Sequence, residues 1–466
     1  MAKSSKKGKT VFVCQECGYE SPKWLGQCIC GAWNSFVEEK VPDLDLNDTR
    51  RRTSSKGGEG KVGSNNPSPL AQVGTGGYSR VDTEIGELNR VLGGGLVKGS
   101  LTLISGEPGI GKSTIIIQAA ANIANRGEKV LYVTGEEPEE QIKMRADRVC
   151  RDIPPTLFIL AETNMENVMA VCENLNPAFV IIDSIQTMYT EEIESVPGSV
   201  SQVRACGNIL MKIGKTMDIP VFKVAHVTKS GELAGPKIVE HLVDCVLSFT
   251  GERDQDLRVL RAYKNRFGTT NEIGAFKMEE AGLIEIDDLS ATFLDSNGPK
   301  PEGSVVSAIY EGSRPVLLEI QALTAPANVG FARRTSVGID NSRLSMILAV
   351  LEKKCGLTMI NQDVYVNVVG GLRPDSTSVD LAVALAVYSS MRGVTSPRSV
   401  IAIGEIGLTG EIRSIRNIDK IAAEAARMGY EKILVPLRNA ESLKSTDKCQ
   451  IIGVKDIHQA IDAFKE

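Results

Sequence analysis

An eight-residue stretch from Gly106 to Ser113 carries the residue types that bind a triphosphate. It reads Gly-Glu-Pro-Gly-Ile-Gly-Lys-Ser and matches the phosphate-loop pattern G-x-x-x-x-G-K-[ST]. The glycines allow the backbone to curl until several N–H groups point at phosphate oxygens. Lys112 is expected to reach the β- and γ-phosphates, and the Ser113 hydroxyl is expected to hold magnesium. The predicted nucleotide-binding residues are Gly106, Glu107, Pro108, Gly109, Ile110, Gly111, Lys112, Ser113 and Thr114.

Two acidic positions further along the chain have the chemistry to complete this site. Glu136 follows a short apolar run, 129–133, and an acid at such a strand end can orient and deprotonate the attacking water. Its neighbour Glu137 shares this environment. The alternative interpretation is that both acids are solvated residues that begin a helix. A second apolar run, 178–182, ends at Asp183, which we expect in the magnesium shell.

The pentapeptide Lys264-Asn265-Arg266-Phe267-Gly268 places two cations around an asparagine at the end of an apolar segment. Lys264 and Arg266 are expected to stabilise charge on the nucleotide of a neighbouring subunit. The alternative is a basic turn in which Phe267 fills the core, and the pentapeptide alone leaves the two interpretations equal. His226 ends a further expected strand and is either a γ-phosphate sensor or a structural residue.

Four cysteines near the N-terminus have the spacing of a zinc site. The two pairs are Cys14 with Cys17 and Cys28 with Cys30. Thiolate pairs brought together by chain reversal suit the tetrahedral coordination of zinc. The second pair is one residue shorter than the usual C-x-x-C, so a strained bite is expected, and thiols without a metal are the alternative. The aromatic residues expected to pack a small core around the metal are Trp24, Trp33 and Phe36.

The elements around these residues predict an α/β fold. Residues 101–104 have the pattern of a buried strand that enters the phosphate loop, and 113–125 has the pattern of the helix that leaves it. The apolar runs at 129–133 and 178–183 fit parallel strands that are buried on both faces. Strands built by crossovers in this way deliver their terminal acids to one edge of a sheet.

Composition divides the 466 residues into four parts. The expected parts are a cysteine module at 1–37, a linker at 38–72, a nucleotidase domain at 73–295 and a C-terminal α/β domain at 296–466. The linker contains an arginine run, 50–52, which we interpret as a solvated stretch, with contact to phosphate as the alternative.

The net charge of −5 excludes a generally basic nucleic-acid coat, so any nucleic-acid contact is expected on local patches. No apolar run approaches the ~18 residues that a membrane span needs. Ten cysteines, of which four are clustered, fit a reducing cytoplasm with one metal site better than a disulfide framework.

Together, the cysteine module, the phosphate loop, Asp183 and the pentapeptide resemble the RadA (Sms) family of bacterial DNA repair proteins over essentially the whole chain. The resemblance implies a RecA-like P-loop ATPase core and a small N-terminal zinc-ribbon-like module. It also implies a C-terminal α+β domain similar to the Lon protease domain and to the second domain of ribosomal protein S5. The implied cofactors are ATP, Mg²⁺ and one Zn²⁺ per chain.

The same resemblance implies an activity. Members are expected to form ring hexamers with DnaB-type helicase activity on single-stranded DNA, to promote branch migration of recombination intermediates, and to work with the recombinase RecA. Lys264 and Arg266 then act across the subunit interface, and two loops, 191–202 and 228–237, line a central DNA channel. The implied nucleotide, magnesium and catalytic residues are Lys112, Ser113, Glu136 and Asp183.

Because the C-terminal domain resembles a protease domain, proteolysis must be weighed. A Ser–Lys dyad needs a lysine beside the serine hydroxyl. Ser378 falls where the Lon nucleophile lies, but we expect it to cap a helix that starts at Val379. Asp419 occupies the matching lysine position, and Lys420 is turned from it by ~100° on a helix. Protease activity is therefore not expected.

Three other functions share parts of this pattern. A KaiC-like signalling ATPase or kinase would be indifferent to DNA, an ATP-dependent protease would need Ser378, and a zinc-dependent adaptor would not need Lys112. The pentapeptide favours the DNA-stimulated motor. In the C-terminal domain the candidate DNA contacts are Arg314, Arg333, Arg334, Lys353 and Lys354.

Overall fold

The computed structural model describes residues 9–14, 19–41, 77–225, 238–251, 257–294, 299–327, 332–370, 374, 376–443 and 449–466. The chain forms two compact units, one up to Thr270 together with Phe276–Glu285, and one made of Asn271–Ala275 and Ile286–Glu466. No disulfide joins the nine cysteines within these ranges. Among the same residues, no helix has both the length and the apolar character needed to cross a bilayer.

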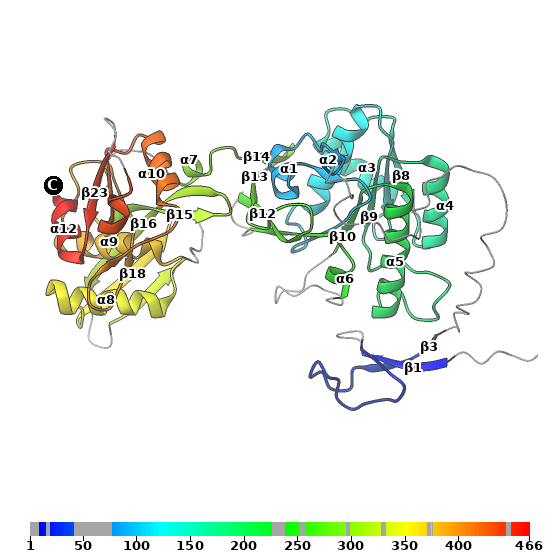
Figure 1. The fold of residues 1–466 in the computed structure, drawn as a ribbon, viewed down its shortest axis with the longest axis horizontal. Coiled ribbons are helices and arrows are strands. Elements are labelled where there is room, and N and C mark those ends of the chain that lie inside the picture. Colours follow the sequence, from blue (N-terminus) through cyan, green and yellow to red (C-terminus); the bar gives the residue numbers. More distant parts are fainter. Residues whose placement is uncertain are drawn as a thin grey trace, which may run out of the picture. The chain divides into compact units, whose positions relative to one another are not determined.

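The first unit is built on a nine-stranded sheet (Figure 1). Its strands, in spatial order, are β14 (Gly282–Glu285), β13 (Ile273–Glu279), β12 (Leu257–Asn265), β11 (Cys245–Thr250), β6 (Leu101–Ser105), β10 (Val221–Val224), β9 (Phe179–Asp183), β7 (Val130–Thr134) and β8 (Leu157–Ala161). The pairs from β11 to β8 are parallel, while β12 is antiparallel to β11. The expected strands at 101–104, 129–133 and 178–183 are confirmed as β6, β7 and β9.

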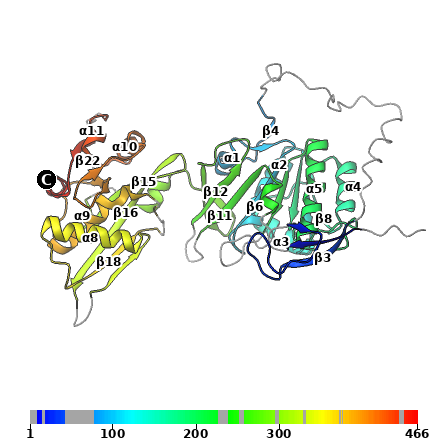
Figure 2. The ribbon, with the colours of Figure 1, turned by 60° about the horizontal axis from the view of Figure 1, so that its bottom comes forward.

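Helices cover both faces of this sheet (Figure 2). One face carries α1 (Gly86–Leu92), α2 (Lys112–Asn125) and α3 (Glu139–Val149), and the other carries α4 (Met165–Leu175) and α5 (Val200–Met217). Alternate residues of each strand therefore enter two separate cores, as Tyr132 and Val133 of β7 do. The remaining elements of the unit are α6 (Ile238–His241) and the strand pair β4 (Arg80–Val81) and β5 (Leu96–Val97).

The cysteine module is a three-stranded antiparallel sheet. Its strands are β2 (Glu20–Ser21), β1 (Lys9–Cys14) and β3 (Phe36–Val41). Phe36 is buried with Cys14 and Cys28, whereas Trp24 is 52% and Trp33 is 71% exposed. The prediction that both tryptophans pack the core is therefore wrong. The interior is small enough to be filled by two cysteines and one phenylalanine, and the Trp24 indole donates at the surface to the carbonyl of Phe36 (3.2 Å).

The second unit contains a seven-stranded sheet. Its strands, in spatial order, are β17 (Arg334–Val337), β18 (Gln362–Val368), β16 (Arg314–Pro326), β15 (Ser304–Glu311), β19 (Val400–Ala402), β22 (Lys432–Pro436) and β23 (Gln450–Val454). Its helices are α7 (Leu289–Phe293), α8 (Asn341–Cys355), α9 (Asp380–Arg392), α10 (Ile418–Arg427), α11 (Leu437–Ala440) and α12 (Ile457–Lys465), with a short hairpin of β20 (Glu405–Ile406) and β21 (Ile412–Arg413). The helix α9 packs on β15 and β16, and α8 and α12 pack on α9.

Candidate functional site

The phosphate loop lies between β6 and α2, as its sequence predicts. Gly106, Gly109 and Gly111 have φ values of 152°, 81° and 117°, which L-residues with a side chain rarely adopt. A Cβ at Gly106 would also lie 2.9 Å from the carbonyl oxygen of Phe249. The side chain of Ile110 is buried in the core and so fixes the loop to it. All three glycines are therefore required by backbone conformation, and Gly106 is also required by space.

Lys112 starts α2 and is folded back onto its own loop. Its ammonium donates to the carbonyl oxygens of Gly106 (2.7 Å) and Glu107 (3.0 Å), and the residue is only 4% exposed. Burial lowers the pKa of Lys112 to about 8, although the nearby carboxylates of Asp183 and Glu136 favour its charged form. A triphosphate offers the ammonium stronger acceptors than two carbonyls.

Nucleotide binding at about pH 8.5 is expected to take up protons, because part of the Lys112 population is then neutral and a bound triphosphate favours the ammonium. Affinity should accordingly fall as the pH rises above the Lys112 pKa of about 8. Calorimetric titrations in two buffers with different ionisation heats measure this uptake. Lys112→Arg keeps a permanent cation and should abolish the Lys112 contribution. The same uptake in that variant would contradict the assignment.

Ser113 and Asp183 are brought together at the carboxyl edge of the sheet. The Ser113 hydroxyl donates to Asp183 Oδ2 (3.0 Å), and the Tyr132 hydroxyl donates to the same oxygen (2.5 Å). Burial raises the pKa of Asp183. Burial and the adjacent Asp183 raise the pKa of Tyr132, so its hydroxyl remains a donor. A hydroxyl and a carboxylate oxygen are the ligands that Mg²⁺ takes in such sites.

The two neighbouring glutamates have separate partners. The Ser184 hydroxyl donates to Glu136 Oε1, while Glu137 Oε1 accepts from Arg145 (2.8 Å). Both acids precede α3, which starts at Glu139, so neither belongs to the first turn of that helix. Glu136 is exposed and lies at the same sheet edge as Asp183. This geometry favours Glu136 over Glu137 as the group that receives a proton from water.

A cavity of about 770 Å³ opens beside the loop. Its lining residues are Pro108, Gly109, Gly111, Lys112, Ser113, Thr114, Glu137, Arg145, Arg148, Met278, Glu279 and Glu280. The volume is in the range of small-molecule sites, and residues of α3 and of the end of β13 line the cavity together with the phosphate loop. Within the described part of the chain, Arg145 Nη1 and Glu137 Oε2 are buried without a hydrogen-bond partner. Two of the described residues that line the cavity therefore carry a buried polar atom without a hydrogen-bond partner.

Lys264 and Arg266 lie at the opposite end of the sheet from their own phosphate loop. Asn265, the last residue of β12, pairs with Cys245, which in turn pairs with Thr102 near the start of β6. The phosphate loop leaves β6 at its other end, about 10 Å beyond Thr102 along the strand. Within one chain, the two cations are thus not placed to contact the nucleotide that this loop holds.

The other members of the pentapeptide have structural contacts. The Asn265 amide donates to the carbonyl of Val91 (3.2 Å) at the end of α1, and the ring of Phe267 packs edge-on against Tyr78. A Cβ on Gly268 would lie 3.2 Å from the Cα of Gly93. These residues therefore make structural contacts, but Phe267 is only half-buried against the exposed Tyr78, so it does not fill the core as the turn interpretation expects. The Arg266 side chain is 61% exposed. The Lys264 ammonium donates to the carbonyl of Glu240 (2.8 Å).

Three cysteines of the N-terminal module converge. The sulfur atoms of Cys14, Cys28 and Cys30 all lie within 4.8 Å of one another, and Cys14 and Cys30 are 3.9 Å apart. A tetrahedral zinc ion with bonds of about 2.3 Å holds its sulfurs about 3.8 Å apart, so these thiols fit zinc. The shortened second pair does not separate them: the Gly31 N–H donates to the Cys28 carbonyl (2.9 Å) in a tight turn, and the Cys30 sulfur lies with the other two although Cys30 is exposed.

Several predicted residues lie outside the described residues. They are Cys17, His226, the arginine run 50–52 and the loop 228–237.

Cys28→Ser is expected to remove most of the bound zinc, because a neutral hydroxyl replaces one of the converging thiolates. Zinc content of the purified protein measures this loss, and nucleotide binding should stay within about twofold of the unaltered protein. Cys355→Ser, in α8 of the second unit, is the matched control and should keep its zinc. Full zinc in Cys28→Ser would contradict the site.

The position of a Lon-type dyad in the second unit holds no paired serine and lysine. The Ser378 hydroxyl donates to the carbonyl of Ala308 (3.2 Å), and the Lys420 ammonium donates to the Tyr310 hydroxyl (2.7 Å). That bond raises the pKa of Lys420, which is opposite to what a general base needs.

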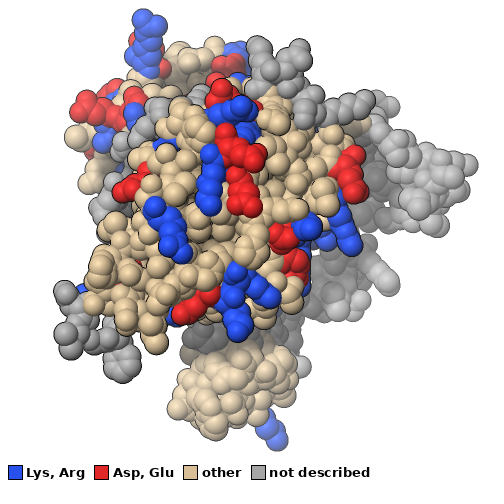
Figure 3. All heavy atoms as spheres, turned by 90° about the vertical axis from the view of Figure 1, so that its left-hand side faces the viewer, with Lys and Arg blue, Asp and Glu red and all other residues tan. Residues whose placement is uncertain are grey.

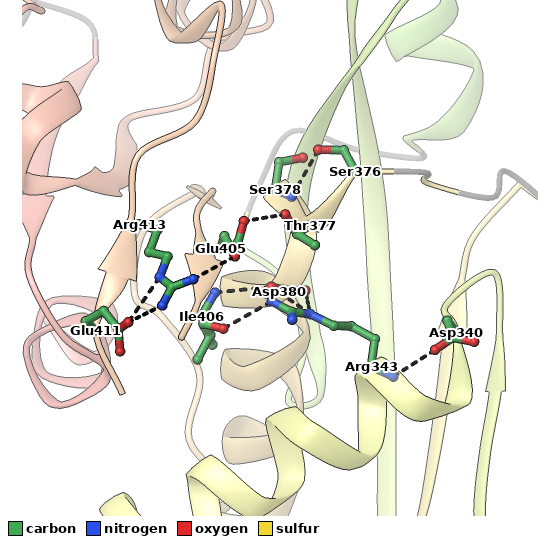
Figure 4. A network of polar contacts seen from close by, with 10 residues as sticks. All are labelled: Asp340, Arg343, Ser376, Thr377, Ser378, Asp380, Glu405, Ile406, Glu411 and Arg413. Carbon is green, nitrogen blue, oxygen red and sulfur yellow. Dashed lines mark hydrogen bonds and ion pairs between the residues drawn. The ribbon is translucent and has the colours of Figure 1, made fainter. Parts of the chain in front are cut away.

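The prediction that Ser378 caps a helix is wrong. Ser378 lies within a 3₁₀ turn, Thr377–Val379, and its own N–H donates to the hydroxyl of Ser376 (Figure 4). The following helix begins at Asp380, whose carboxylate accepts from the Arg343 guanidinium and from the N–H of Ile406 (Figure 4). An ion pair between the buried Asp380 and the half-buried Arg343 therefore lies at the start of the helix.

On the face drawn in Figure 3, Lys and Arg side chains are interspersed with Asp and Glu. Arg333 and Arg334 are exposed at the edge strand β17, and Lys353 and Lys354 are exposed in the last turn of α8. Arg314 starts β16.

Comparison with known proteins covers nearly the whole chain. The DNA repair protein RadA of Bacillus subtilis (strain 168) is 47% identical over 456 residues, which is 98% of each chain. RadA proteins of Halalkalibacterium halodurans and Streptococcus pyogenes serotype M1 are also 47% identical, over 98% of this chain and 98% and 99% of theirs.

Three family models match separate parts of the chain. They are an AAA domain at residues 67–232, the ChlI subunit of Mg-chelatase at 326–439 and a rubredoxin metal binding domain at 12–38. A crystal structure of the RadB recombinase matches 44% of this chain and 99% of its own, with 23% identity and a TM-score of 0.36.

Proposed function

Because the chain belongs to the RadA family of bacterial DNA repair proteins, we propose that it is a DNA-dependent ATPase of recombinational repair. Six copies form a ring that acts as a DnaB-type helicase on single-stranded DNA and promotes branch migration of recombination intermediates. ATP with Mg²⁺ and one Zn²⁺ per chain are the proposed cofactors. RecA is the proposed recombinase partner, and the cytoplasm is the proposed location.

The observation that carries this proposal is the position of Lys264 and Arg266. Both cations lie at the amino ends of the parallel strands, whereas the phosphate loop lies at their carboxyl ends. A residue that stabilises transferring phosphate must touch it. These cations can do so only on the nucleotide of another copy, and this requirement supports an active site shared between adjacent subunits of a ring.

Within that shared site, each residue of the chain has a separate task. Lys112 exchanges its loop carbonyls for the β- and γ-phosphate oxygens, and Arg145 and Arg148 face the remaining part of the nucleotide. Mg²⁺, when bound by Ser113 and Asp183, supplies positive charge to the phosphate oxygens. Glu136, oriented by the Ser184 hydroxyl, receives the proton of the attacking water.

The ATPase rate with and without single-stranded DNA, measured beside unwinding of a forked duplex, tests the function. Single-stranded DNA should raise the rate, and the stimulation should fall steeply as salt rises, because phosphate contacts release counterions. Hydrolysis that is indifferent to DNA, with no unwinding, would favour a signalling ATPase instead.

The separate positions of Ser378 and Lys420 argue against proteolysis as a second function. The Ser378 hydroxyl donates to the Ala308 carbonyl and not to Lys420, and the hydrogen bond from Lys420 to Tyr310 raises the pKa of Lys420, so this lysine remains charged. We therefore propose that the Lon-like domain serves assembly and DNA contact.

A further inference from the structure

Asp244 lies immediately before β11. Its backbone N–H, its backbone carbonyl and both carboxylate oxygens all make hydrogen bonds or ion pairs. Its N–H donates to the Leu101 carbonyl (2.9 Å), and its own carbonyl accepts from the N–H of Arg266 (3.0 Å). In its carboxylate, Oδ2 accepts from the N–H of Leu101 (3.1 Å) and from Lys215 (3.3 Å), and Oδ1 accepts from Arg266 Nη1 (3.3 Å). Asp244 therefore joins the start of β6 to the turn that carries Arg266.

This arrangement fixes the carboxylate much more firmly than the guanidinium. The Asp244 side chain is 11% exposed, whereas that of Arg266 is 61% exposed. Only one guanidinium nitrogen of Arg266 contacts Asp244 among the described residues, and a guanidinium has five N–H donors. The remaining donors are left for an external anion. A carboxylate that binds one side of a guanidinium restricts its rotamers while the other side stays available.

We propose that Asp244 is a positioning residue for phosphoryl transfer, which holds the Arg266 guanidinium in the orientation needed to reach the triphosphate of a neighbouring subunit. This inference rests on the proposed function, in which Arg266 acts between subunits. Of the three groups that its carboxylate contacts, Arg266 is the one that acts on the nucleotide, so the effect of Asp244 on hydrolysis passes through Arg266. It also ties Arg266 to β6, the strand that enters the phosphate loop of its own subunit.

The variant Asp244→Asn tests this role in the full-length protein. Asparagine keeps an oxygen for the N–H of Leu101 but loses the charge that orients the arginine. We expect kcat for ATP to fall by about 10- to 100-fold, the effect of misplacing one catalytic group, while KM stays within about twofold. Lys215→Gln is the matched control, because Lys215 contacts the same carboxylate and is 52% exposed, yet lies outside the pentapeptide. Its kcat should be unchanged.

Two further measurements separate positioning from a structural role. Combining Asp244→Asn with Arg266→Ala should lower kcat no further than Arg266→Ala alone, because the pair acts as one unit. Mixing Asp244→Asn subunits with Lys112→Ala subunits should restore hydrolysis, since each supplies what the other lacks. Mixing Asp244→Asn with Arg266→Ala subunits should not. A structural defect would be additive and would not be complemented in this selective way.

Asp244→Glu keeps both the charge and the acceptor oxygens of the carboxylate but shifts them by one methylene. It is the second test variant, used if Asp244→Asn fails to bind nucleotide. It should lower kcat less than Asp244→Asn does. Full kcat in both Asp244 variants, with a large loss in Arg266→Ala, would overturn the positioning role and leave the proposed function standing. Full kcat in Arg266→Ala would instead contradict both the positioning role of Asp244 and the proposed function.

Discussion

Lys112→Ala is expected to lower the rate of ATP hydrolysis by at least about 100-fold, because it removes the cation that we propose contacts the phosphates in the loop. Ammonium and phosphate interact strongly there, since Lys112 is only 4% exposed. Steady-state hydrolysis measured with saturating single-stranded DNA gives the effect. Lys98→Ala, at an exposed position in the same unit, is the control and should retain the full rate. An unchanged rate in Lys112→Ala would remove this lysine from the site.

Arg266→Ala is expected to lower kcat by about 1,000-fold, the lower range for an arginine that stabilises a transferring phosphoryl group. ATP affinity should change by no more than about twofold, because Arg266 lies far from the phosphate loop of its own chain. Equilibrium binding of a labelled nucleotide, measured beside hydrolysis, separates the two quantities. A loss of kcat without a loss of ATP affinity distinguishes Arg266→Ala from Lys112→Ala, which should lower both kcat and ATP affinity.

Arg151→Ala is the matched control for Arg266→Ala. Arg151 is an exposed arginine just beyond α3, and its removal should change neither quantity. A loss of ATP affinity in Arg266→Ala as large as the loss of rate would contradict action on a neighbouring nucleotide.

The central part of the site could be predicted because local sequence determines it. The phosphate loop needs glycines with positive φ, and the strands that deliver Glu136 and Asp183 are short apolar runs buried on both faces. These features lie within a few residues of the chemistry that they serve. The family assignment and the three-part fold followed from the same motifs and are confirmed.

The supporting residues could not be predicted because they depend on contacts between distant segments. Tyr132 reaches Asp183 from an adjacent strand, and nothing in a run of apolar residues marks it as a hydrogen-bond donor. Asp244 meets Leu101 across 143 positions of sequence. A polar residue just before an apolar strand was the available signal for Asp244, but that signal is common.

Two wrong predictions have a similar cause. Trp24 and Trp33 were expected inside the cysteine module, but burial depends on the interior volume, which the sequence pattern does not give. Ser378 was expected to cap a helix, but the chain first makes a 3₁₀ turn. The start of the helix is then stabilised by the Arg343–Asp380 ion pair between α8 and α9, a long-range contact that helix-capping rules do not include.

Mixing two inactive variants, Lys112→Ala and Arg266→Ala, tests the shared site most directly. One supplies an intact arginine and the other an intact phosphate loop, so mixed rings contain complete sites at some interfaces. With equal amounts and independent sites, about a quarter of the full DNA-stimulated rate should return, since each site needs one intact group from each neighbour. The account would be contradicted if the mixture recovered no hydrolysis although its subunits are shown to exchange, and if the unaltered protein hydrolysed ATP at the full rate as a monomer.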